Sequence, residues 1–121
     1  MEKLLSGLTT RYKALHPDAP DSALGLIDRA FEMARIAHEG QLRKSGEAYI
    51  THPVAVAEIL ADIGLDQATI SAALLHDTVE DTDYSLDLLR KDFGNEVAGL
   101  VDGVTKLDKL TYGPSAEAET L

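Results

Sequence analysis

The sequence contains no cysteine and no tryptophan, and Phe31 and Phe93 are its only phenylalanines. The absence of cysteine excludes disulfide bonds and thiolate zinc sites, and it fits a reducing cytoplasmic compartment. The core of this 121-residue chain must therefore consist of leucine, isoleucine, valine and alanine, a composition that favours packed helices. The length is that of one domain.

Long apolar runs and a basic surface are also missing. No run approaches transmembrane length, and the first residues do not resemble a signal peptide, so we expect a soluble protein without membrane contact. The formal net charge of -10 argues against nucleic-acid binding. No lysine or arginine occurs between Lys44 and Arg90, whereas acidic residues crowd together from Asp77 to Asp83. Like charges this close repel one another unless a cation lies among them.

Apolar residues recur with helical spacing along most of the chain. The predicted helices cover residues 2–15, from 21 or 22 to 38, 51–63, from 66 or 67 to 77, 86–93 and 95–104. The predicted N-terminal caps are Asp21 or Ser22, Thr51, Ser85 and Asn95. The β-branched residues of 51–63 would also suit a strand, but its length and the glycine at its end favour a helix. The helix that ends at 77 is apolar nearly all round, which predicts the centre of a bundle. Residues 113–115 predict a break before a further helix.

The segment from 39 to 50 is polar and basic and shows neither the helical nor the strand period. Arg43 and Lys44 lie in it. An acidic protein that binds an anionic substrate needs a local basic contact, and this pair would provide one. An ordinary solvated loop is the alternative interpretation.

The four histidines differ in their claim to bind a metal. His16 lies beside a proline in a linker, and we expect it to be solvated. His38 ends an amphipathic helix, where a hydrogen-bonded structural histidine is as reasonable as a ligand. His52 precedes a proline in the first turn of a helix and is a weaker candidate than His76, which ends a buried helix beside Asp77.

Glu80 and Asp81 follow Asp77 at the spacing that would place them on its face of a continuing helix. Charged groups at the edge of a core are costly unless they are paired, and a metal ion would compensate them. A mixture of imidazole and carboxylate ligands suits manganese, iron or zinc better than calcium or magnesium. The pattern therefore indicates a metal centre that acts on a phosphate.

Four segments of the chain together resemble one family. They are residues 38–53 (HEGQLRKSGEAYITHP), 74–82 (LLHDTVEDT), 93–94 (FG) and 101–107 (VDGVTKL). In order and spacing they are similar to the N-terminal HD hydrolase domain of long RelA/SpoT-type enzymes, which make and degrade the guanosine alarmones ppGpp and pppGpp. The resemblance extends over about residues 22 to 121 and implies an all-α HD-domain bundle.

The resemblance implies hydrolysis of the alarmone 3′-pyrophosphate to GDP or GTP plus pyrophosphate, with one Mn²⁺ ion. By position, the family's metal ligands match His52, His76 and Asp77, and His38 is left as a structural neighbour. The family's acidic pair, which positions or activates the attacking water, matches Glu80 and Asp81. The guanosine-nucleotide loop of the family matches Arg43, Lys44 and Ser45.

The chain departs from the family pattern at two points. Ala48 stands where the family has proline, and the fourth metal ligand of the family, an aspartate, lies downstream of residue 121. We therefore expect residues 1–121 to be the N-terminal part of one HD domain, incomplete at its C-terminus, without synthetase and regulatory domains. Two alternatives remain: a phosphohydrolase for another nucleotide, and an inactive fragment that binds a partner or forms a homo-oligomer through exposed apolar surface.

Overall fold

The computed structural model describes residues 2–104 and is all-helical over this range, as predicted. The helices are α1 (Glu2–Leu15), α2 (Asp21–Ala37), α3 (Thr51–Asp62), α4 (Gln67–Asp81) and α5 (Leu86–Phe93), and residues 95–104 are also helical. An isolated antiparallel bridge joins Leu42 to Ala48, and residues 2–104 contain no longer strand. The helix predicted after residue 115 lies outside the described residues.

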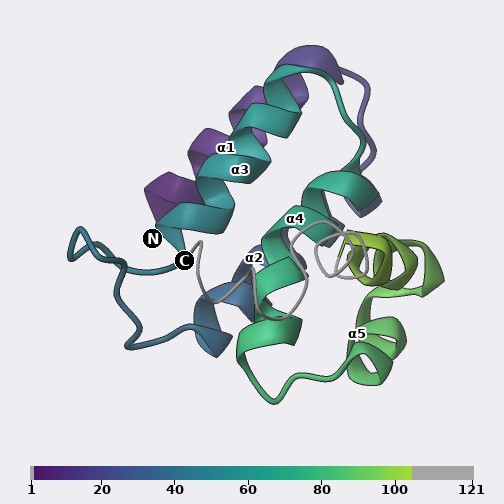
Figure 1. Cartoon of the computed structure of the whole chain (residues 1–121). Coiled ribbons are helices and arrows are strands. Elements are labelled where there is room, and N and C mark those ends of the chain that lie inside the picture. Colours follow the sequence, from purple (N-terminus) through teal and green to yellow (C-terminus); the bar gives the residue numbers. More distant parts are fainter. Residues whose placement is uncertain (1, 105–121) are drawn as a thin grey trace.

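The helices pack in two main pairs, as Figure 1 shows: α1 lies alongside α3, and α2 packs against α4. Helix α3 also contacts α4 and so joins the two pairs. Loop residues 38–50 run from the end of α2 to the start of α3. This topology fixes both ends of the loop on helices that contact α4.

Helix α4 is the central element, as its apolar composition predicted. It packs against both α2 and α3, and it buries residues on several sides: Ala68, Ile70, Ser71, Ala72, Leu74, Leu75 and Thr78. The facing part of α2 buries Ile27, Phe31 and Ala34. A helix buried on several sides has little freedom to rotate or slide, because each shift would expose apolar surface. Exposure costs a free energy of about 25 cal/mol per Å². The end of α4 is therefore fixed by the core.

The capping predictions were partly right. Ser85 caps α5 as expected, with its hydroxyl accepting a hydrogen bond from the Leu88 amide at 3.1 Å. Neither Asp21 nor Ser22 caps α2, because Pro20 occupies the N-cap position and has no side-chain acceptor. Thr51 lies inside α3, since the preceding residue is already helical, and its hydroxyl donates to the Ala48 carbonyl instead.

The prediction that α4 ends at Asp77 and gives way to an acidic turn was wrong. The helix continues to Asp81, where the Thr82 amide still donates to the Thr78 carbonyl at 3.1 Å. Thr78 is fully buried and anchors this last turn against the rest of the fold. The extra turn keeps Glu80 and Asp81 in helical register with His76.

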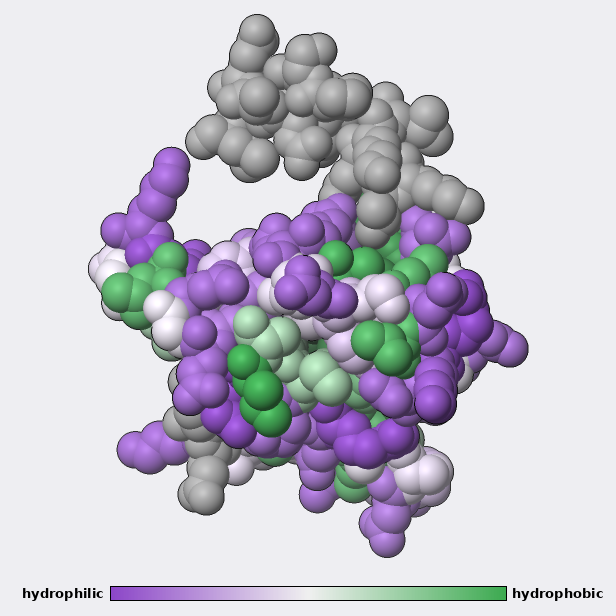
Figure 2. Space-filling view, turned by 90° about the horizontal axis from the view of Figure 1, so that it is seen from below, coloured by the Kyte–Doolittle hydropathy of each residue, from purple (hydrophilic) through white to green (hydrophobic). Residues whose placement is uncertain are grey.

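The described surface is mixed in character. On the face in Figure 2, hydrophobic side chains form separate patches among hydrophilic ones. Helix α3 contributes the exposed apolar side chains of Val56 and Ile59, and Ile63, directly after its last residue, is also exposed. The expected exposure of apolar groups is thus observed, whereas self-association stays a prediction. Within residues 2–104, every helix is too short or too polar to cross a membrane.

Candidate active site

Three chemically active side chains meet at the end of α4. His76, Asp77 and Glu80 each offer a ligand atom, and these atoms lie within 4.8 Å of one another. His76 Nδ1 is 3.2 Å from Asp77 Oδ1, and His76 Nε2 is 3.5 Å from Glu80 Oε1. His76 and Asp77 are each 20% exposed at the side chain, so the group is reachable from solvent without being fully solvated. The imidazole thus lies between two carboxylates.

Helical register accounts for this grouping. His76 and Glu80 are four residues apart, so they share one face of the extended α4. The neighbouring Leu74 and Leu75 are fully buried, and they hold this turn against the core. Neighbouring residues on a helix diverge by about 100°, but Asp77 is close enough to reach back to the imidazole. The core therefore sets the position of the group.

The donor set fits a divalent transition metal. One imidazole with two carboxylates is a combination typical of manganese, iron or zinc sites. Separations below 5 Å between the ligand atoms suit a single ion. Asp81, the other predicted acidic site residue, lies on the last turn of α4 and is exposed, outside this group of three.

The local environment affects Asp77 and Asp81 in opposite directions. Burial pushes the pKa of Asp77 upward, but hydrogen bonds from His76 and Tyr49, with the nearby His52, hold that pKa below its ordinary value. Burial and the charge of Asp77 raise the pKa of Asp81. Asp77 is thus the carboxylate kept ionised by its neighbours, as a metal ligand must be.

His52 reaches the same region from α3. It lies in the first turn of that helix and is exposed. With His76 and Asp77 it lines a pocket of about 310 Å³ whose other walls are mainly apolar and come from α3, α4 and residues 100 and 104. The fold therefore brings His52 to the pocket that His76 and Asp77 line, although His52 is not part of the tight cluster.

The residues predicted to bind the substrate line a neighbouring hollow. Arg43, Lys44 and Ser45 line a depression of about 630 Å³ together with Tyr49 and His52. Because His52 lines both this hollow and the apolar pocket, the two lie next to each other. Lys44 and Ser45 are exposed, so a ligand can reach them from solvent.

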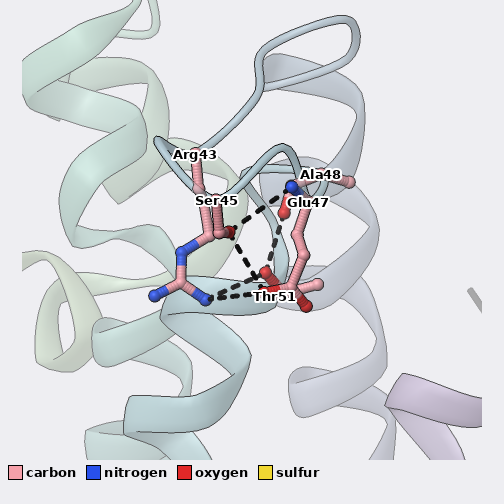
Figure 3. Close-up of polar contacts among 5 residues, drawn as sticks. All are labelled: Arg43, Ser45, Glu47, Ala48 and Thr51. Carbon is pink, nitrogen blue, oxygen red and sulfur yellow. Dashed lines mark hydrogen bonds and ion pairs between the residues drawn. The ribbon is translucent and has the colours of Figure 1, made fainter.

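The basic loop is held by its own hydrogen bonds, as Figure 3 shows. The Arg43 guanidinium donates to the Thr51 hydroxyl at 3.2 Å and lies 4.0 Å from the Glu47 carboxylate. Ser45 donates to the same carboxylate at 3.1 Å. Gly46 has a φ of 93°, a backbone conformation that residues other than glycine rarely adopt. The Arg43 side chain is thus held in place by local contacts.

Tyr49 is a site residue that the sequence reasoning missed. Its hydroxyl donates a hydrogen bond of 2.7 Å to Asp77 Oδ2 on α4. Burial and the neighbouring Asp77 carboxylate raise the pKa of Tyr49 well above its ordinary value. Within the sequence, the sole signal is its place in the segment 38–53 that carries the family resemblance. Nothing in local spacing could pair two residues 28 positions apart.

The remaining two histidines have structural surroundings. His38 is buried at 2% exposure, with Nδ1 3.1 Å from the Gln41 side-chain oxygen and its ring 4.4 Å from that of Tyr49. His16 was expected to be solvated, but its ring stacks on that of Tyr12, with 4.4 Å between the ring centroids. Stacking on a buried tyrosine removes part of the imidazole from water.

Comparisons with known proteins agree with this geometry. Residues 30–120 match the family described as "HD domain". The chain is 58% identical over 105 residues to a GTP pyrophosphokinase of Streptomyces coelicolor, covering 87% of this chain and 12% of that protein. It is 58% identical over 87 residues to a guanosine-3′,5′-bis(diphosphate) 3′-pyrophosphohydrolase of Haemophilus influenzae, covering 72% of this chain and 13% of that protein.

A third relative carries both activities in its name. The bifunctional (p)ppGpp synthase/hydrolase SpoT of Escherichia coli is 52% identical over 100 residues, which cover 83% of this chain and 14% of that protein. The chain therefore spans less than one sixth of the length of these curated relatives. Their names describe the activities of much longer proteins.

Proposed function

Because this chain belongs to the HD domain family, we propose that it is the hydrolase part of a RelA/SpoT-type enzyme. Its substrates are guanosine-3′,5′-bis(diphosphate) and the corresponding pentaphosphate, and the reaction releases pyrophosphate from the 3′ position. Relatives named for this hydrolysis, at 52–58% identity, support the substrate. They span far more sequence than these 121 residues, so the activity of the chain itself is part of the proposal.

One observation carries the proposal: a group of metal-binding type lies next to a basic loop. His52 lines both the pocket of His76 and Asp77 and the hollow of Arg43 and Lys44. A substrate with diphosphate groups at two positions of its ribose can span two such neighbouring sites. In a chain of net charge -10, a basic hollow beside an acidic group is an arrangement suited to an anionic substrate.

Of the α4 group, His76 and Asp77 would hold the ion together with His52 from the same pocket, and Glu80 is left for the attacking water. The proposed ion is Mn²⁺. When bound, a divalent ion lowers the pKa of a water molecule and neutralises phosphate oxygens. The depressed pKa of Asp77 supports its role, because a carboxylate ligand has to be ionised. The place of His76 between two carboxylates supports its role in the same way.

Glu80 and Asp81 are the proposed general bases. Either carboxylate would accept the proton of the attacking water as the water oxygen forms a bond to the phosphorus attached to the ribose 3′ oxygen. The bond between that phosphorus and the 3′ oxygen then breaks, and the oxygen takes up a proton to become the 3′ hydroxyl. GDP or GTP and pyrophosphate are the products. The position of Glu80 beside His76 supports this assignment.

Arg43, Lys44 and Ser45 are the proposed nucleotide contacts. A planar guanidinium can stack on a base and donate hydrogen bonds to phosphate oxygens. The Arg43 side chain is already held by Thr51 and Glu47, which reduces the entropy lost when a nucleotide binds. Lys44 supplies a mobile positive charge and Ser45 a hydroxyl at the exposed rim of the hollow.

The test is pyrophosphate release from guanosine-3′,5′-bis(diphosphate) at saturating Mn²⁺, measured for the chain and for two aspartate variants. Asp77→Ala removes a proposed ligand, whereas Asp83→Ala removes the same charge from an exposed position beyond α4. We expect release by the unaltered chain and by Asp83→Ala, and none by Asp77→Ala. Equal release by Asp77→Ala, or none by the unaltered chain, would contradict the proposal. Faster release from the adenosine analogue would favour a phosphohydrolase for another nucleotide.

A further inference from the structure

We propose that Tyr49 is a positioning residue for the metal centre: its hydroxyl fixes the Asp77 carboxylate in the orientation that binds the ion. This inference rests on the proposed function, because it takes Asp77 as a metal ligand. It adds a residue to which the sequence analysis assigns no role and which lies outside the cluster at the end of α4. Tyr49 comes from the loop between α2 and α3, not from α4 itself.

The two carboxylate oxygens of Asp77 have different partners. Oδ2 accepts the Tyr49 hydroxyl at 2.7 Å, and Oδ1 lies 3.2 Å from His76 Nδ1. A hydrogen bond from a hydroxyl to an ionised carboxylate is short and about twice as strong as one between neutral groups. With Oδ2 engaged by the phenol, rotation of the carboxylate is restricted and Oδ1 is kept beside the imidazole. The hydroxyl thus selects which oxygen faces the other ligands.

Tyr49 is itself held in place, so it can act as a fixed donor. Its amide donates to the Gln41 carbonyl at 2.9 Å, and its ring lies 4.4 Å from that of the buried His38. The Gln41 side-chain oxygen in turn contacts His38 Nδ1 at 3.1 Å. The Tyr49 ring also meets the His52 ring edge-on, with 6.0 Å between the ring centroids. Because the phenol ring has little freedom, the hydrogen bond to Asp77 costs little further entropy.

The same residue connects the two halves of the site. Tyr49 lines the hollow of Arg43, Lys44 and Ser45, while its hydroxyl reaches the metal-binding end of α4. Hydrogen bonds to a ligating carboxylate commonly change metal affinity by about 10- to 100-fold when they are removed. The expected consequence is that the loop that holds the nucleotide also sets the affinity for the ion.

Replacing Tyr49 by Phe tests the inference, because it removes the hydroxyl and keeps the ring against His38. The matched control is Tyr84→Phe, since Tyr84 donates a hydrogen bond of the same 2.7 Å length to Asp92 on α5. Mn²⁺ binding by each metal-free protein is measured by titration calorimetry and by the electron paramagnetic resonance signal of free Mn²⁺. Thermal unfolding without metal records any general loss of structure.

We expect Tyr49→Phe to weaken Mn²⁺ binding by about tenfold or more, with Tyr84→Phe binding like the unaltered chain. Any pyrophosphate release lost in Tyr49→Phe should return as Mn²⁺ is raised, which a general folding defect would not produce. Equal Mn²⁺ affinity of Tyr49→Phe and the unaltered chain would overturn the role of Tyr49 and leave the proposed function standing. Equal weakening in both tyrosine variants would also overturn it. No Mn²⁺ binding by the unaltered chain would instead refute the metal centre itself.

Discussion

The end of α4 and the loop of residues 39–50 are positioned by different forces. The α4 group is placed by burial, because the helix beneath it contributes fully buried residues to the core. The loop is placed by short-range hydrogen bonds among Arg43, Ser45, Glu47 and Thr51. The position of the candidate metal site therefore depends on the packing of the core, whereas that of the loop depends on a few exposed polar contacts.

The comparison predicts that the two regions can be damaged separately. Replacing His76 by Ala should have the largest effect, because it removes the imidazole that lies between Asp77 and Glu80. We expect loss of measurable Mn²⁺ binding, assessed by calorimetric titration. His16→Ala is the control, since His16 stacks on Tyr12 away from this group. Mn²⁺ binding by His76→Ala as tight as that of the unaltered chain would refute the assignment.

Removal of the Arg43 side chain should weaken nucleotide binding and leave the metal site intact, because the loop's hydrogen bond to Asp77 comes from Tyr49. Arg43→Ala removes a guanidinium whose hydrogen bonds to a charged phosphate are each worth about 1.5–3 kcal/mol, or roughly 10- to 150-fold in affinity. Binding of a non-hydrolysable guanosine-3′,5′-bis(diphosphate) analogue measures this loss, with Mn²⁺ affinity as the second readout. A fall in Mn²⁺ affinity of the same size would show that the regions are not separable through Arg43.

The smallest effect is expected at the opposite end of α4, where Asp66 caps the helix. Its carboxylate accepts the Thr69 amide at 2.9 Å, and this contact lowers the pKa of Asp66. Asp66→Ala should reduce the free energy of unfolding by about 1 kcal/mol at pH 7 and leave Mn²⁺ affinity unchanged.

The pH dependence of that effect has a definite sign. Because the pKa of Asp66 is lowered by folding, its contribution is complete above the unfolded pKa of about 3.9 and disappears as the pH falls through the folded pKa. Urea unfolding should therefore separate Asp66→Ala from the unaltered chain at pH 7, and the gap should close in strong acid. A gap that widens toward low pH would contradict the capping role.

Much of the fold followed from the sequence. Apolar periodicity predicted the helices, and the relatives' names together with the HD domain match confirm the RelA/SpoT resemblance. The errors concerned helix ends. Helix α4 continues to Asp81, where buried Thr78 anchors its last turn. Helix α2 has no side-chain cap because Pro20 occupies the N-cap position. The end of α4 and the start of α2 are set by tertiary packing and backbone conformation, which the spacing of residues in the sequence does not reveal.

The candidate site was predictable where its residues are close in sequence. His76 and Glu80 come together because they are four residues apart on α4, and Asp77 is the direct neighbour of His76. The contact of Tyr49 with Asp77 depends on how the loop folds back onto α4, so the sequence pattern could not reveal it. The ligand roles of His52, His76 and Asp77, the roles of the other predicted site residues and the identity of the ion stay predictions.

We propose that this chain removes the 3′-diphosphate of its nucleotide and leaves the 5′-diphosphate intact. Phosphorus-31 NMR of guanosine-3′,5′-bis(diphosphate), incubated with the chain and Mn²⁺ and then treated with EDTA, distinguishes the two positions directly. We expect the 3′-diphosphate resonances to be replaced by that of pyrophosphate while the 5′-diphosphate resonances of GDP persist. An unchanged spectrum, or loss of the 5′-diphosphate resonances, would contradict it.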